Sequence, residues 1–305
     1  APDSELVYSI GVTGFDTAGF VNAQDGYLSR HREFVREAMR SGPEIVQMVA
    51  LDHSISPRIL LAILEYQSGW VINPATPDDE AFPIYRNSSR RGLFQQLDWL
   101  ADTLNLGYYR WRDGSVTALD FPDGTQQRLH PTLNAGTAAL QFAFSRIYND
   151  PEWSADVGPD GVYVAYNQLF GDPFEKSFEP LIPDGLTQPE LGLPFVDGRE
   201  WLFISGPHAA WEPGSPWAAL DFAPPSLEAG CVKSDEWVAA PTAGLIVRSG
   251  DGVVVLDLDG DGREQSGWAI LFLHVAAEGR VPLGRTVEAG DLIGHPSCEG
   301  GRSTG

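Results

Sequence analysis

The sequence has few cysteines, few basic residues and no long apolar run. It holds two cysteines, Cys231 and Cys298, so at most one disulfide can form within the chain. Its 20 lysines and arginines face 42 acidic residues, and the net charge of −22 repels nucleic-acid phosphate and anionic membranes. The longest apolar candidate, WAILFLHVAA at 268–277, is much shorter than the roughly 18 residues of a membrane helix. We therefore expect a soluble protein that neither binds nucleic acid nor inserts into a membrane.

The chain begins at Ala1, with neither methionine nor an apolar leader. A secreted protein begins this way after a signal peptide is cleaved at a small residue, and a shortened sequence would begin the same way. We expect a secreted, extracellular or envelope-associated protein. In that compartment a disulfide between Cys231 and Cys298 can close a long loop, with two buried thiols as the alternative.

The composition changes at a proline-rich segment, PLIPDGLTQPELGLPFVDG at 180–198. Proline stiffens the chain and does not propagate a helix or a central strand, so this segment is predicted to be a linker. Helical periodicity precedes it, and short β-branched runs separated by Gly-Asp turns follow it, which is typical of antiparallel hairpins. We expect an α+β multidomain protein, with an all-α domain at 1–179 and an antiparallel β domain at 199–305.

Three segments of the first half are predicted to be helices, at 54–70, 93–112 and 132–148. In the first, Pro57 suits the opening turn and Gly69 can end the helix. The same helix carries Gln67 on its apolar stripe. At 100° per residue, Glu65 lies about 200° around the axis from Gln67.

Two histidines and an aspartate carry the candidate chemistry of the second half. His208 and Asp221 stand in SGPHAAWEPGSPWAALDFAPP at 205–225, His274 stands in LFLHVA, and GDLIGHPSCEGGRSTG closes the sequence. This pattern resembles the lysostaphin-type zinc endopeptidases of the LytM and LasA kind, which cut peptide cross-links in bacterial cell walls. The resemblance covers roughly 200–305 and implies that peptidoglycan is the partner.

The resemblance implies that His208 and Asp221 bind one zinc ion, and that His274 is a base or stabilises the transition state. Zinc accepts imidazole nitrogen and carboxylate oxygen, and a catalytic site combines three protein ligands with a water molecule. Such a site lowers the pKa of that water and polarises the scissile carbonyl. Taken one at a time, His208 could be an ordinary loop histidine, Asp221 a turn aspartate and His274 a core histidine. Their occurrence together favours the zinc site.

The third ligand of the family is the second histidine of a His-x-His motif that follows the STG turn. The sequence stops at Gly305, where that motif is expected, and His295 precedes the turn, so we expect His295 not to be a ligand. With two ligands, the 305-residue chain is expected to bind zinc weakly and to hydrolyse nothing. One zinc per chain is expected once the motif is present.

The stretch DLDGDG at 257–262 resembles the start of a calcium loop, with Asp257, Asp259 and Asp261 spaced by two. Position 12 of an EF-hand loop holds a glutamate, and here Trp268 stands there. We expect a solvated hairpin turn rather than a calcium site.

Four short motifs of the first half occur in the order found in lytic transglycosylases: QSGW at 67–70, GLFQQL at 92–97, NAGTAAL at 134–140 and VAYNQ at 164–168. The resemblance implies a lysozyme-like fold. The position of the general acid holds Gln67, whose amide has no proton to give to a glycosidic oxygen. We expect a non-catalytic glycan-binding module that uses Gln67, Tyr166 and Asn167, or a helical support without a ligand. The aromatic residues fit either sugar stacking or the core: Trp70, Trp99, Tyr108, Tyr109, Trp111 and Tyr166.

The sequence thus favours a secreted zinc-dependent peptidoglycan endopeptidase. Two alternatives stay open: a non-catalytic protein that binds or regulates the wall, and a structural component of the envelope. A His-x-His motif after Gly305 would distinguish the enzyme from both. The sequence predicts neither the bond that is cleaved nor the oligomeric state.

Overall fold

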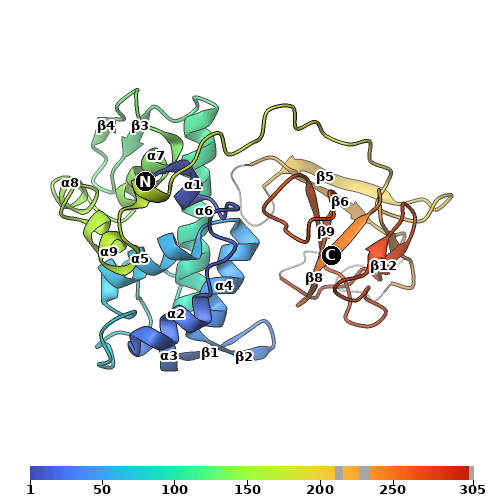
Figure 1. Ribbon diagram of the computed structural model, residues 1–305, viewed down its shortest axis with the longest axis horizontal. Helices are drawn as coiled ribbons and strands as arrows, with labels where there is room; N and C mark the ends of the chain where they lie inside the picture. Colours follow the sequence, from blue (N-terminus) through green and yellow to red (C-terminus); the bar gives the residue numbers. More distant parts are fainter. Residues whose placement is uncertain (210–215, 227–233, 302–305) are drawn as a thin grey trace. The chain divides into compact units, whose positions relative to one another are not determined.

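The protein is described here by a computed structural model that covers residues 1–209, 216–226 and 234–301 (Figure 1). The chain forms two compact units. Unit 1 comprises Ala1–Leu181 with His208–Ala218, and unit 2 comprises Ile182–Pro207 with Ala219–Gly305. Within the described residues, no helix is both long enough and apolar enough to cross a bilayer.

Unit 1 is mainly helical. Its helices are α1 (Asp3–Leu6), α2 (Thr17–Gln24), α3 (Tyr27–Arg30), α4 (Gly42–His53), α5 (Pro57–Ser68), α6 (Leu93–Arg112), α7 (Ala135–Ser145), α8 (Glu152–Asp156), α9 (Val162–Phe170) and the 3₁₀ turn η1 (Pro173–Lys176). The three predicted helices correspond to α5, α6 and α7. As expected, Pro57 opens α5, and Gly69 ends it with a positive φ of 69°.

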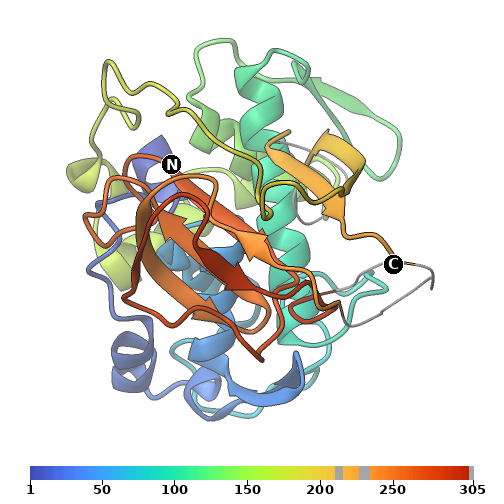
Figure 2. The ribbon, with the colours of Figure 1, turned by 90° about the vertical axis from the view of Figure 1, so that its right-hand side faces the viewer.

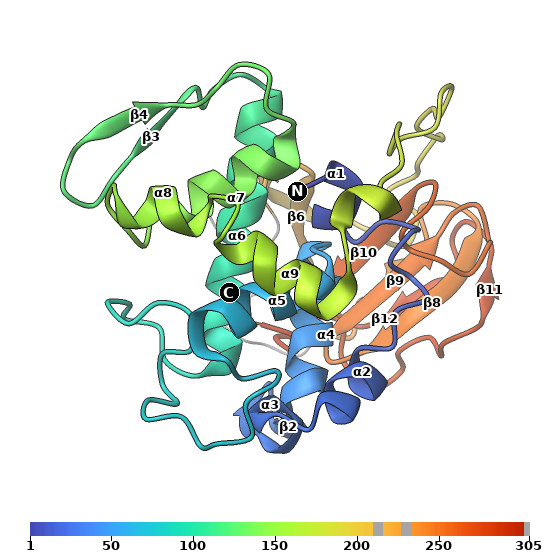
Figure 3. The same cartoon turned by 60° about the vertical axis from the view of Figure 1, so that its left-hand side comes forward.

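The core of unit 1 forms around α6, which packs against α7 and α4 (Figure 3). Gly107 lets α6 and α7 approach closely, because a Cβ atom there would lie 2.8 Å from the Cβ of Phe142. The largest fully buried side chains of this core are Trp70, Tyr108, Phe142 and Phe144. The aromatic residues considered for sugar stacking are therefore largely core residues.

Two short hairpins correct the expectation of an all-α first domain. Strands β1 (Arg32–Val35) and β2 (Ala38–Ser41) form one antiparallel pair, and β3 (Ala118–Asp120) and β4 (Gln126–Arg128) form the other. The sequence contains no period-2 apolar run in either place, and each hairpin buries only one strand residue, Val35 in the first and Leu119 in the second. Unit 1 is thus a helical unit with two hairpins.

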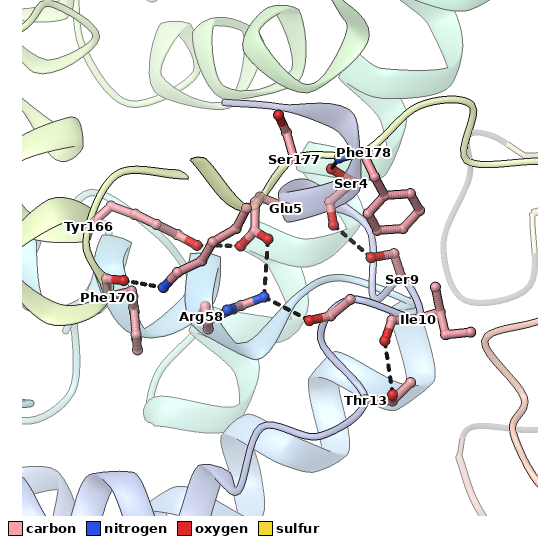
Figure 4. A network of polar contacts seen from close by, with 12 residues as sticks. Ser4, Glu5, Ser9, Ile10, Thr13, Arg58, Tyr166, Phe170, Ser177 and Phe178 are labelled. Atoms are coloured by element: carbon pink, nitrogen blue, oxygen red, sulfur yellow. Dashed lines mark hydrogen bonds and ion pairs between the residues drawn. The ribbon is translucent and has the colours of Figure 1, made fainter. Parts of the chain in front are cut away.

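A buried polar network joins α1, α5 and α9 inside unit 1 (Figure 4). Glu5 is 1% exposed, and its carboxylate accepts a hydrogen bond from Arg58 at 3.0 Å and another from the hydroxyl of Tyr166. Arg58 also donates to the carbonyl oxygen of Gly11 at 3.2 Å. Because the buried carboxylate is paired with a guanidinium, the charge is compensated where water is excluded.

Unit 2 consists of short antiparallel strands, as the turn chemistry predicted (Figure 2). The strands are β5 (Leu202–His208), β6 (Ala219–Ala223), β7 (Val238–Ala239), β8 (Gly244–Gly250), β9 (Val253–Asp257), β10 (Ala269–Leu273), β11 (Thr286–Val287) and β12 (Leu292–Gly294). One sheet has the order β10-β9-β8-β11, and two-stranded sheets pair β12 with β7 and β5 with β6. Ile246, Val254, Leu256 and Ile293 lie at the centre of its core.

The predicted linker at 180–198 belongs to unit 2 from Ile182 onward, and its end pairs with the strands of that unit. Pro194 accepts a hydrogen bond from the backbone of Ala239, and Gly192 donates to Pro241. Phe195 forms a β-bridge with Val238. Only the earlier residues of this segment lack such backbone pairing with unit 2 among the described contacts.

Candidate active site

His274 stands directly after β10 with a left-handed backbone, at a φ of 66°. Residues with a side chain adopt this region rarely, and the surrounding structure has to hold them in it. Here the carbonyl oxygen of His274 accepts from the amide of Ser297 at 2.7 Å, and the next residue, Val275, donates to Gly252 at 2.9 Å. The backbone on both sides of the histidine is therefore fixed by hydrogen bonds.

The imidazole of His274 is oriented by the segment after β12. Its Nδ1 lies 2.9 Å from the carbonyl oxygen of Glu299, an atom that can only accept. A proton on Nδ1 makes this contact a hydrogen bond and leaves Nε2 as the proton acceptor of the neutral ring. The sequence predicted His274 but not this partner.

The carboxylate of Glu299 holds its own backbone in place. It accepts from Arg280 at 2.6 Å and from the amide of Ala277 at 2.8 Å. Arg280 is 9% exposed and also donates to the carbonyl oxygens of Val275 and Ala276. A single guanidinium therefore ties together the two segments that flank the imidazole.

His208 and Asp221 lie on the paired strands β5 and β6. The Nδ1 of His208 lies 2.6 Å from the carbonyl oxygen of Ala209, so that a proton on Nδ1 leaves Nε2 of the neutral ring unprotonated. Asp221 Oδ2 accepts from the hydroxyl of Ser205 at 2.5 Å. These two contacts resemble the outer hydrogen bonds that orient metal ligands.

The donor set of His208 and Asp221 fits zinc in kind, since imidazole nitrogen and carboxylate oxygen are both zinc ligands. By the division of the chain into two units, His208 belongs to unit 1 and Asp221 to unit 2. Within 1–209, 216–226 and 234–301, no group of three potential ligand side chains close enough to share one ion contains either residue. Both assignments stay predictions.

His295 has structural contacts. Its Nδ1 lies 2.9 Å from the carbonyl oxygen of Glu236, and its ring centroid lies 3.8 Å from that of Trp237. Its own carbonyl oxygen accepts from Ala276. These contacts place His295 within the packing of unit 2. Its expected absence from the set of zinc ligands stays a prediction.

Gln67 lies in a polar cluster of unit 1. Its Oε1 accepts from the hydroxyl of Tyr148 at 2.7 Å, and its buried Nε2 has no hydrogen-bond partner among the described residues. One residue earlier, Tyr66 donates to Asp156 at 2.5 Å. Burial raises the pKa of the Asp156 carboxyl, and the hydrogen bond from Tyr66 partly opposes that rise. Sequence reasoning missed Asp156.

Glu65 has a different role from Gln67. Its carboxylate accepts from the backbone amides of Val71 and Ile72, at 2.9 and 3.0 Å, and so caps the turn after α5. The helix therefore carries the two side chains to separate environments, as the helical geometry predicted. Both of these hydrogen bonds of Glu65 go to backbone amides, whereas Gln67 accepts from the side chain of Tyr148.

Tyr166 is a core residue rather than a sugar-stacking one, which corrects its assignment as a glycan contact. It is buried and donates its hydroxyl hydrogen bond to Glu5. Burial is also the largest cause that raises its pKa. Asn167, on the same helix, is exposed and keeps its predicted role as a hypothesis. Cys298 is disulfide-bonded, whereas Cys231 lies outside the described residues.

Comparison with known proteins identifies the family of residues 1–182, which make up most of unit 1. A family model described as the N-terminal domain of LasA matches residues 1–182. The chain belongs to the LasA N-terminal domain family. Protease LasA from two strains of Pseudomonas aeruginosa is 25% identical to it over 295 aligned residues, which cover 88% of this chain. Because that share exceeds residues 1–182, the similarity to LasA extends into unit 2.

The chain spans 65% of the length of these curated relatives. A solved structure described as a novel M23 metalloprotease, pseudoalterin, from the deep sea is 28% identical. That match covers 39% of this chain and 67% of the other, with a TM-score of 0.31. The sequence of this family member is thus related to LasA along both units.

Proposed function

We propose that the protein is a secreted zinc-dependent endopeptidase that hydrolyses peptide cross-links of peptidoglycan. The observation that supports this most is the geometry of His274. Its backbone is held in a left-handed conformation, and its Nδ1 faces a carbonyl oxygen. Unusual backbone conformations of this kind cluster at functional sites. The relationship to a protease along 88% of the chain supports the same conclusion.

In this proposal His208, through Nε2, and Asp221, through a carboxylate oxygen, hold the zinc ion. Zinc, when bound, polarises the scissile carbonyl and lowers the pKa of a water molecule. His274 acts at its Nε2, where a neutral imidazole accepts a proton or, once protonated, donates a hydrogen bond to the developing charge. The family takes its third ligand from a His-x-His motif, and residues 1–305 do not include one.

Unit 1 is proposed to be a non-catalytic module that binds glycan or supports unit 2. The amide of Gln67 supports the lack of glycosidase chemistry, because it has no acid proton to donate. Of the residues predicted to bind glycan, the exposed Asn167 is the one through which a sugar hydroxyl could bind. A lysozyme-like fold for this unit remains part of the proposal.

A second candidate is a protein that binds the cell wall without catalysis. One observation favours it: Gln67 stands at the position of the acid. Both candidates use peptidoglycan as the partner. They differ in whether a peptide bond is broken.

The test compares this chain with a version extended through a His-x-His segment. The extended protein should hold about one zinc per chain and release cross-bridge peptides, because three ligands and a water complete a catalytic site. His208→Ala should abolish zinc and cleavage together. His274→Ala should keep the zinc while turnover falls by about 10²–10⁴-fold, the usual range for a lost acid–base group.

The control is His130→Ala, which removes an exposed histidine of unit 1 and should change neither property. Metal analysis and a peptide-release assay measure both. An extended protein that keeps full zinc and full turnover in its His208→Ala form would contradict the assignment. Binding to peptidoglycan without cleavage in the extended protein would support the second candidate.

A further inference from the structure

The loop between β9 and β10 brings three aspartates of unit 2 together. Asp257 ends β9, and Asp259 and Asp261 follow it in DLDGDG. One carboxylate oxygen from each lies within 4.8 Å of the other two. Asp257 pairs with Ala269 across the hairpin, so this cluster closes one end of the β9–β10 pair.

The interior member of the cluster has an unpaired oxygen. Asp257 is 0% exposed, and its Oδ2 accepts from the amide of Gly262 at 2.9 Å. Its Oδ1 is also buried and has no hydrogen-bond partner among the described residues. A buried carboxylate oxygen without a partner is costly, and such groups usually pair or coordinate a metal.

The neighbouring carboxylates increase this cost. The pKa of Asp259 is raised, first because its carboxyl hydrogen-bonds Asp257 and then because of burial. Asp261 is held in place by two donors, the amide of Arg263 at 2.9 Å and the hydroxyl of Ser266 at 2.8 Å. Three carboxylates at this distance, one of them buried, favour a compensating positive charge, either a shared proton or a cation.

We propose that Asp257, Asp259 and Asp261 bind a calcium ion, each through one carboxylate oxygen. The donors are all oxygens, which Ca²⁺ prefers and which suit zinc less well. Gly262 follows them with a φ of 87°, the sharp turn that calcium loops place after their third ligand. This proposal replaces the expected solvated turn.

The tryptophan at position 12 of the loop lowers the expected calcium affinity but does not exclude a calcium site. Trp268 cannot supply the bidentate carboxylate of an EF-hand, so the affinity should be low, with a dissociation constant of roughly 0.1–1 mM. Binding to the folded state alone should stabilise the β9–β10 hairpin in proportion to calcium concentration. The proposal does not rest on the peptidase function, because its ligands and its measurements are separate.

The experiment uses the full chain, freed of metal with a chelator, and Tb³⁺ as a luminescent substitute for Ca²⁺. Trp268 stands beside the loop and should transfer excitation to a bound Tb³⁺. Calcium should quench this emission by competition, and it should raise the unfolding temperature. Asp261→Asn should weaken both effects about tenfold or more, since it removes one charged ligand. Asp197→Asn, at an exposed aspartate of unit 2, is the matched control.

Two further variants separate the possible outcomes. Trp268→Phe should dim the Tb³⁺ emission and keep the thermal shift caused by calcium. Asp257→Asn should abolish that shift. If this variant of a buried residue does not fold, Asp261→Asn repeats the test at an exposed residue. The proposal would be overturned if the wild-type protein showed neither a calcium-dependent rise in unfolding temperature nor Tb³⁺ emission that calcium reduces. A proton shared between the carboxylates would then be the remaining explanation of the cluster. An equal shift in wild type and Asp261→Asn would overturn the proposal as well, by placing the ion elsewhere.

Discussion

The Nδ1 atom of His274 lies 2.9 Å from the carbonyl oxygen of Glu299, 25 residues further along the chain. The contact fixes the tautomer of the imidazole, and Arg280 fixes the contact, because its guanidinium binds the side chain of Glu299. In the proposed peptidase, an imidazole that rotates freely would spend less time in reactive geometry. The positioning of His274 is therefore open to test through residues that do not touch a substrate.

We predict that Arg280→Met loosens the ring of His274. The variant removes the 2.6 Å contact to Glu299 and the donors to Val275 and Ala276. Nitrogen-15 spectra of the histidine side chain should show a single Nδ1–H tautomer in the wild type and a mixture in the variant. In the extended protein kcat should fall while KM changes little, because the ring acts on the reaction rather than on binding.

Arg280→Lys should recover only part of the effect, since a lysine keeps the charge without the planar fork of donors. The control is Arg285→Met, which removes an exposed arginine of the same unit. Unchanged histidine spectra in Arg280→Met, in a folded protein, would show that the Glu299 carbonyl orients the ring without help.

A second prediction concerns the left-handed backbone at His274. His274→Asn should be tolerated, because asparagine adopts positive φ more readily than most residues. His274→Val should lower the free energy of unfolding by about 1–2 kcal/mol more than the asparagine variant, since a β-branched residue is strained at φ 66°. Urea unfolding of both variants measures the difference. Equal stabilities would indicate that the backbone relaxes on substitution.

Helix capping supplies a third prediction, which includes a pH dependence. Ser41 and Glu44 form a capping box at the start of α4, in which Glu44 accepts from the amide of Ser41 at 2.7 Å. Ser41→Ala should cost about 1 kcal/mol of stability. The hydrogen bonds from Ser41 lower the pKa of Glu44 below its ordinary value of 4.5. Its contribution should be complete above that value and disappear as the pH falls through the lowered pKa.

Glu44→Gln should therefore lower the stability slightly at neutral pH, where the contribution of the carboxylate is complete, and flatten the stability profile below about pH 4.5. Because Glu44 is exposed, we expect a small effect that added salt reduces further. A profile identical to that of the wild type in the acid range would contradict the role assigned to this carboxylate.

The sequence predicted the elements whose signals are local. Pro57 and Gly69 mark α5 because each residue type suits its position whatever surrounds it. The β1–β2 hairpin gave no such signal. Its turn residues, Arg36 and Glu37, both have positive φ without an asparagine or a glycine. An ion pair of 2.7 Å from Arg36 to Asp52 of α4 helps to hold the turn, and this contact between distant residues is not visible in the sequence.

The candidate sites show the same contrast between local signals and contacts that form only in the folded chain. His274 could be predicted because a reactive side chain stands in a recognisable pattern. Its partner could not, because Glu299 acts through a backbone carbonyl that any residue provides. The spacing of the aspartate loop is visible in the sequence, whereas the burial of Asp257 depends on packing within the β9–β10 hairpin and is not. The spacing of residues in the sequence indicates which side chains could bind one ion together. The burial of a carboxylate indicates whether its charge needs a partner.

The last prediction is that Gln67 makes unit 1 inactive toward glycan chains. The full chain should release no anhydro-muropeptides from peptidoglycan, because an amide cannot protonate the leaving oxygen. Gln67→Glu tests whether the rest of a glycosidase site is present, and product in that variant alone would show that only the acid had been lost. Asp156 is the competing acid, since burial raises the pKa of its carboxyl within the same polar cluster. Product from the wild type that Asp156→Asn abolishes, and that Gln67→Ala leaves intact, would contradict the prediction and move the acid to Asp156.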